Sequence, residues 1–144
     1  MKGEETVDHN VKMLWHGIYR MYNQQAVKHD ITTSIGFVLL IINSKEGTPA
    51  TKIAPLMGLE SRSLTRMLKS MEEKGFIYRE KDPTDGRSVR IFLTDLGKQK
   101  REISRATVLR FNEFTKQSIE KEKLDIFFEV VDQINSLIDK KSIF

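Results

Sequence analysis

The sequence predicts a mainly helical fold of the α+β class, in which amphipathic helices accompany one small β-hairpin. Three observations predict it. Apolar residues recur at helical spacing near both ends of the chain, two short helical patterns meet at Gly58, and two strand-like segments flank a polar turn at residues 82–86. A chain of 144 residues can bury one hydrophobic core, so we predict a single domain over residues 1–144.

The composition restricts the class of protein. With 39% hydrophobic and 31% charged residues, the chain is expected to be soluble and globular. Its longest apolar run, residues 37–42, is far too short to span a bilayer, and no signal-type segment follows Met1, so we expect a cytoplasmic protein without membrane contact. The absence of cysteine excludes disulfides and thiolate metal sites. A net charge of +4 favours a polyanionic partner only weakly.

The first two helices are predicted from apolar spacing and from capping residues. Val7, Val11, Leu14 and Ile18 follow steps of three and four, which is the stripe of an amphipathic helix. The segment 31–34 then supplies threonine and serine for a helix start. The dense apolar run 35–42 fits a strand or a buried helix, and we interpret it as a helix.

Residues 51–75 are predicted to form a helix-turn-helix. Ala54 is small enough for two helices to touch there, Gly58 can adopt the left-handed conformation of a tight turn, and apolar residues at 59, 64 and 67 can clamp the helices together. Pro55 lacks an amide hydrogen and is tolerated only in a first turn, so the first helix should begin near Thr51 or have a distorted first turn.

The outer face of the second helix is a candidate DNA-reading surface. It carries hydroxyl and basic side chains, which can contact phosphates and base edges in a major groove. An ordinary solvated surface is the alternative for such a face. Its candidate DNA-binding residues are Ser61, Arg62, Ser63, Thr65, Arg66 and Lys69.

A β-hairpin is predicted directly after the helix-turn-helix. Its strands are expected at residues 76–79 and 89–93, and the turn between them contains Asp85 and Gly86. This turn would project Arg87 toward a narrow minor groove, while Arg90 on the second strand could contact a phosphate. A purely structural hairpin is the alternative. Thr94 can cap a long helix, and a last amphipathic helix follows it.

Four segments together resemble the MarR family of winged helix-turn-helix regulators: residues 51–68, 71–77, 82–89 and 93–97. The resemblance is specific over roughly residues 31–100. It implies a bacterial homodimer in which a lobe at 31–99 binds double-stranded DNA and helices at 1–30 and 100–144 form the dimer. It also implies that Arg87 enters the minor groove and that Asp85 and Gly86 support the hairpin.

The resemblance further implies a transcriptional regulator, in our interpretation a repressor, that binds a pseudo-palindromic operator and is released by a small aromatic or lipophilic effector. The predicted dimerisation residues are apolar and come from both ends of the chain: Val7, Val11, Leu14, Ile18, Phe127, Val131 and Ile134. The candidate effector pocket comprises Trp15, Tyr19, Leu39 and Phe111, for which core or dimer packing is the alternative.

Other functions have little support in the sequence. His9 and His16 lie two turns apart without cysteine or close ligand spacing, so we predict no metal site and no cofactor. No phosphate-binding glycine loop, nucleophile elbow or paired-histidine motif is found, so we predict that the protein is not an enzyme. The remaining alternative is a winged-helix module that binds protein and has no operator.

Overall fold

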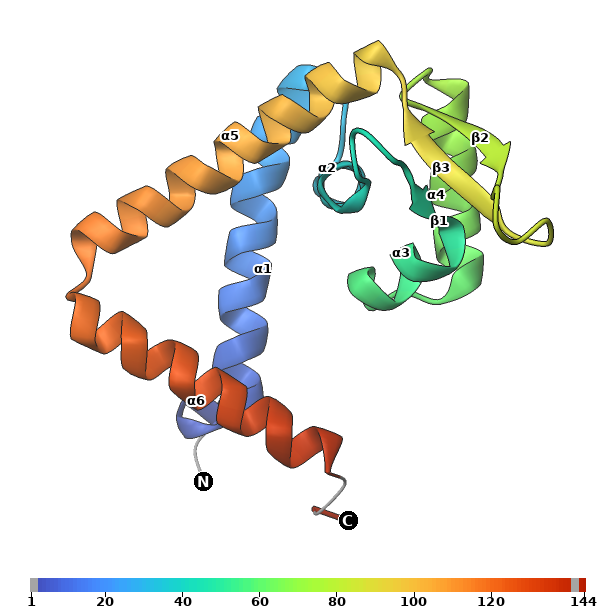
Figure 1. Ribbon diagram of the computed structural model, residues 1–144. Coiled ribbons are helices and arrows are strands. Elements are labelled where there is room, and N and C mark those ends of the chain that lie inside the picture. The colour runs from blue at the N-terminus through green and yellow to red at the C-terminus, as the bar shows by residue number, and fades with distance from the viewer. Residues whose placement is uncertain (1–2, 141–142) are drawn as a thin grey trace. The chain divides into compact units, whose positions relative to one another are not determined.

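The computed structural model describes residues 3–140 and 143–144 (Figure 1). The chain divides into two compact units, residues 1–107 and 108–144, and helix α5 runs from the first into the second. The first unit holds all three strands and most of the helices.

Two helices open the first unit as predicted. After a 3₁₀ turn, η1 (Gly3–Glu5), α1 spans Val7–Ala26, and η2 (Val27–His29) leads to α2 (Thr33–Ile41). The Thr32 hydroxyl caps α2 by accepting a hydrogen bond from the Ile35 amide at 3.2 Å. The apolar run 35–42 is therefore a helix, and its dense hydrophobicity reflects burial on nearly every side.

The helix-turn-helix consists of α3 (Ala50–Met57) and α4 (Ser61–Glu73). Gly58 ends α3 in the left-handed conformation, with φ 64° and ψ 27°, as predicted. The predicted helix start near Thr51 is confirmed, because α3 begins at Ala50. Pro55 lies in the second turn of this helix. There it removes only the bond to the exposed Thr51 carbonyl, and the helix ends two residues later.

A three-stranded antiparallel sheet follows α4. Strands β2 (Ile77–Lys81) and β3 (Val89–Leu93) form the predicted hairpin, and β1 (Thr48–Pro49) pairs with the other edge of β3. The register places Tyr78 opposite Phe92, whose rings stack at 5.3 Å. The two residues before α3 thus add a third strand to the predicted hairpin.

The core of the first unit lies between α2, α3, α4 and the sheet. Its most deeply buried side chains come from all of these elements: Val38, Leu39, Ile42, Ile53, Met71 and Ile91. Leu39 has no exposed surface, which corrects its assignment to an effector pocket. A side chain enclosed by the core cannot line a site open to ligands.

Helix α5 (Asp95–Ser118) begins at the end of the sheet. The Thr94 hydroxyl accepts a hydrogen bond from the Gly97 amide at 3.0 Å and donates one to the Gly75 carbonyl. The predicted cap is therefore confirmed, and it also ties the start of α5 to the end of α4.

The second unit contains the end of α5 and helix α6 (Lys121–Asp139). No residue of α6 is buried, although the helix carries apolar side chains over its whole length. A helix with this composition needs a further surface to cover it.

Candidate nucleic-acid interface

Helix α4 separates an apolar face from a polar one. Leu64, Leu68 and Met71 are buried, and Met67 is partly buried against the same core. The predicted DNA-binding side chains of this helix are all exposed: Ser61, Arg62, Ser63, Thr65, Arg66 and Lys69. We call these six residues the α4 polar face.

The basic residues of the α4 polar face are free cations. Within the described part of the chain, Arg62, Arg66 and Lys69 have no ion-pair partner, whereas Arg79 on β2 binds Glu72 at 3.0 Å. The Thr65 hydroxyl donates to the Ser61 carbonyl at 2.8 Å, so only its acceptor capacity remains for a ligand. Three unpaired cations on one helical face can attract an anionic polymer.

The loop between β2 and β3, residues 82–88, forms the wing. Asp85 organises its tip, because its carboxylate accepts hydrogen bonds from the Arg87 amide at 3.0 Å and from the Ser88 hydroxyl at 3.5 Å. Gly86 and Arg87 are exposed. The guanidinium of Arg87 has no ion-pair partner among the described residues and is available to a ligand.

Asp82 is a second organiser of the wing that the sequence analysis missed. Its Oδ1 accepts hydrogen bonds from the Thr84 amide at 2.9 Å and the Thr84 hydroxyl at 2.8 Å. These bonds, helped by the Asp85 amide and the positive charge of Arg90, lower the pKa of Asp82 to about 2. An aspartate two residues before a threonine in a turn is the signal that could have identified it.

Arg90 is partly buried and is held by contacts within the protein. Its Nη2 binds Asp82 at 3.2 Å, and its Nη1 donates to the carbonyls of Glu46 and Gly47 at 3.1 and 3.3 Å. Only 23% of its side chain is exposed. These contacts engage both terminal nitrogens of Arg90 within the protein, whereas we predicted a phosphate contact from its position.

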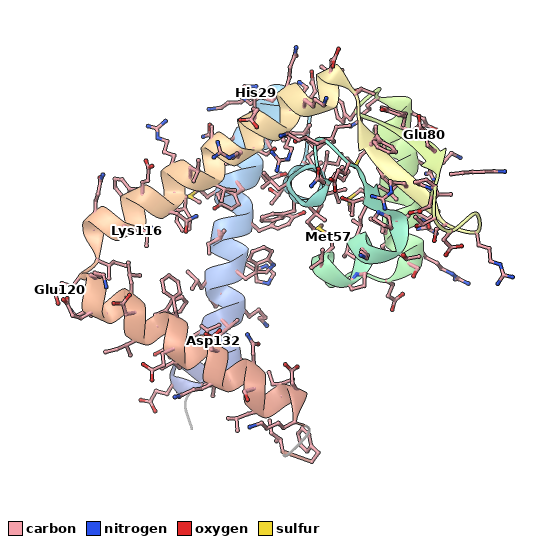
Figure 2. All side chains as sticks on the ribbon, viewed as in Figure 1. His29, Met57, Glu80, Lys116, Glu120 and Asp132 are labelled. Carbon is pink, nitrogen blue, oxygen red and sulfur yellow. The ribbon has the colours of Figure 1, made fainter. Side chains whose placement is uncertain are left out.

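The α4 polar face and the wing belong to the same lobe. Helix α4 packs on β2, and Figure 1 shows the α3–α4 turn and the wing at the end of the lobe away from the start of α5. Figure 2 labels Met57 beside that turn and Glu80 on the strand that leads to the wing. The arrangement offers two neighbouring elements with free basic side chains to one ligand.

Comparison with known proteins identifies the family. The MarR family model matches residues 31–89, which include α2, the helix-turn-helix, β2 and the wing. The transcriptional regulator SarZ of Staphylococcus aureus is 32% identical over 98 residues, which make up 67% of this chain and 66% of SarZ. The chain belongs to the MarR family.

Two further proteins are similar to this MarR-family chain, one in sequence and one in structure. The transcriptional regulator TtmR of Methylorubrum extorquens is 36% identical over 83 residues, which are 58% of this chain but 43% of TtmR. The match thus spans less than two thirds of either relative. A crystal structure of an S. aureus MepR–DNA complex superposes with a TM-score of 0.83 at 21% identity, covering 91% of this chain and 97% of MepR, which shows the winged-helix fold.

Most of the residues predicted to form the dimer interface of this MarR-family chain are exposed to solvent. In the first unit Val7, Val11 and Leu14 are between 52 and 57% exposed, and Ile18 is partly buried. In the second unit Phe127 is 47% exposed, while Val131 and Ile134 are partly buried. Apolar side chains exposed at this density require a further surface for burial.

The predicted effector residues come from both units: Trp15, Tyr19 and Leu39 from the first and Phe111 from the second. Trp15 stacks on Phe37 at 5.9 Å, and the Tyr19 hydroxyl bonds the Ser34 hydroxyl at 2.8 Å, so both help to join α1 to α2. Phe111 belongs to the second unit. A separate open cavity of about 730 Å³ in the first unit is lined by Val27, Asp30, Ile31, Thr32, Lys74, Phe76, Leu96 and Lys100.

Among the described residues, no group of three or more histidine, aspartate and glutamate side chains is placed to hold a metal ion. In the same residues, no helix is both long and apolar enough to cross a bilayer.

Proposed function

We propose that this MarR-family chain is a DNA-binding transcriptional regulator. The observation that carries the proposal is the pairing of free cations on the α4 polar face with an unpaired arginine at the wing tip, on one lobe. Helix α4 would read base edges in the major groove through Arg66 and its neighbours, and Arg87 would enter the adjacent minor groove. The relatives SarZ and TtmR bear the name of transcriptional regulators, and MepR was crystallised with DNA.

We further propose that the protein acts as a homodimer. The exposed apolar side chains of α1 and α6 would be buried between two copies, which would present two α4 polar faces related by a two-fold axis. Such a dimer binds a pseudo-palindromic operator with half-sites about 34–36 Å apart. Bound within a promoter, it would act as a repressor.

We also propose that a small aromatic or lipophilic effector releases the protein from its operator. The cluster of Trp15, Tyr19 and Phe37 between α1 and α2 offers aromatic surface to a small aromatic or lipophilic molecule, and Trp15 is 46% exposed. A ligand would weaken operator binding only to the extent that it prefers a dimer with a different spacing of the recognition helices, typically by about 1–3 kcal/mol.

Selection of binding sites from a random duplex library tests the proposal directly. Purified protein should enrich one sequence with two-fold symmetry. The logarithm of its affinity for that duplex should fall linearly with the logarithm of the salt concentration, with a slope of about −0.9 per neutralised phosphate. If no sequence is enriched and affinity is flat in salt, the lobe serves a protein partner. When a duplex is enriched, its titration into cross-linked and untreated protein would count the chains in each complex.

A further inference from the structure

Arg90 joins three segments that are distant in the sequence. Its Nη1 bonds the carbonyls of Glu46 and Gly47, which precede β1, and its Nη2 bonds Asp82 at the start of the wing. A planar guanidinium with several fixed donors can reach all three acceptors, whereas a lysine ammonium acts as a single point of charge.

From Arg90 a continuous series of contacts leads to the wing tip. Asp82 uses Oδ2 for Arg90 and Oδ1 for the amides of Thr84 and Asp85, at 2.9 and 3.3 Å. Asp85 in turn accepts a hydrogen bond from the Arg87 amide at 3.0 Å. The backbone that presents Arg87 is thus connected to Arg90 through two carboxylates.

The carbonyls that accept hydrogen bonds from Arg90 Nη1 belong to a loop that Asn43 holds in place. Asn43 Oδ1 accepts hydrogen bonds from the amides of Lys45 and Glu46, each at 2.9 Å, directly after α2. Gly47 follows with φ 68°, close to the Ile91 carbonyl and the Phe92 ring. The carbonyls that receive Arg90 therefore belong to a loop with little freedom to move.

We propose that Arg90 is a positioning residue for DNA binding: it fastens the wing to the loop at residues 43–47 and thereby fixes where Arg87 meets the minor groove. This inference rests on the proposed function. It differs from a phosphate contact, because Arg90 would act through Arg87 and would not touch the duplex itself. The two roles give different results when both arginines are replaced.

The variants are Arg90→Met, Arg87→Ala and the double variant, with Arg79→Met as matched control. Arg79 lies on the other strand of the hairpin, and among the described residues its side chain pairs with Glu72 alone, in an exposed pair. Methionine preserves most of the arginine stem, so packing changes little. Asp82→Asn is a second way to break the contact, because an amide oxygen still accepts the Thr84 amide but carries no charge for Arg90.

Two measurements distinguish a positioning role of Arg90 from a direct contact with DNA. Affinity for the selected duplex should fall about tenfold or more in Arg90→Met and in Arg87→Ala, and the double variant should be scarcely worse than either one. In the free protein, NMR order parameters of the wing amides should fall in Arg90→Met and Asp82→Asn, while those of α4 stay close to wild type. Arg79→Met should change neither measurement.

Several results would overturn the positioning role. Losses that multiply in the double variant would make Arg90 a direct contact, and unchanged order parameters at residues 83–88 would mean that it does not hold the wing. Should Arg90→Met fail to fold, Asp82→Asn decides by the same criteria. Should the wild-type protein enrich no duplex, the proposed function fails by itself, and the order parameters alone decide whether Arg90 fixes the wing.

Discussion

Replacing Gly47 by alanine should destabilise the protein far more than the same change at Gly58. Both glycines have left-handed backbone, with φ 68° and φ 64°, so in each variant alanine meets the steric cost of that conformation, about 1–2 kcal/mol. Their surroundings differ. A Cβ at Gly58 meets nothing within 4 Å, whereas a Cβ at Gly47 would lie 2.7 Å from the Ile91 carbonyl and 2.8 Å from the Phe92 ring.

The cost of the close contacts that a Cβ at Gly47 would make can be estimated from the effect of overpacking a protein core. The Ile91 carbonyl belongs to the central strand of the sheet and cannot retreat without disturbing its pairing, and a forced contact of this kind costs about 1–3 kcal/mol. The Gly47→Ala variant should therefore lose about 2–5 kcal/mol of unfolding free energy in total, against about 1–2 kcal/mol for Gly58→Ala.

Urea unfolding at one fixed protein concentration measures the difference, because a dimer makes the midpoint depend on concentration. The two variants should show similar m-values and clearly separate midpoints, with Gly47→Ala the lower. Equal midpoints would refute the reasoning, since they would mean that the loop before β1 can move away from the sheet at no cost.

The other predictions concern the interface and the dimer. Arg87→Ala should weaken duplex binding without changing the unfolding midpoint, and wild-type affinity in gel-shift titrations would remove the wing from the site. Arg66→Ala should lose about 1–3 kcal/mol more on the selected duplex than on random DNA, and equal losses would make Arg66 a phosphate contact. Deletion of residues 1–20 should give a monomeric or insoluble protein, and a well-behaved dimer in sedimentation experiments would contradict the assigned interface. Because the pKa of Asp82 is lowered to about 2 from its ordinary 3.8, its contribution to stability should be complete above pH 4 and lost as the pH falls toward 2. An NMR titration midpoint near 4 for this carboxyl group would exclude the wing geometry.

Local patterns in the sequence were enough to predict the elements that carry the candidate interface. The stripe from Val7 to Ile18, the turn at Gly58 and the cap at Thr94 are each properties of neighbouring residues, and each is confirmed. The separation of buried Leu64 from exposed Arg66 likewise follows from helical periodicity alone.

The errors concern contacts between distant residues. Nothing near Arg90 in the sequence indicates that its guanidinium would find carbonyls 43 and 44 residues earlier. The burial of Leu39 depends on the core that the first unit builds around it and cannot be read from its own helix. Pro55 shows a different limit, because a short helix tolerates in its second turn the loss of one hydrogen bond to an exposed carbonyl.

The junction at residues 94–97 has a consequence for how the protein could change shape. The Thr94 amide donates to the Phe76 carbonyl at 3.0 Å, and that same carbonyl lies so close to Gly97 that any side chain there would collide with it. The start of α5 is consequently fixed to residues 75 and 76, which lie just after α4. Under the proposed function, a tilt of α5 would move α4 with it and would change the angle between the α4 polar face and a duplex.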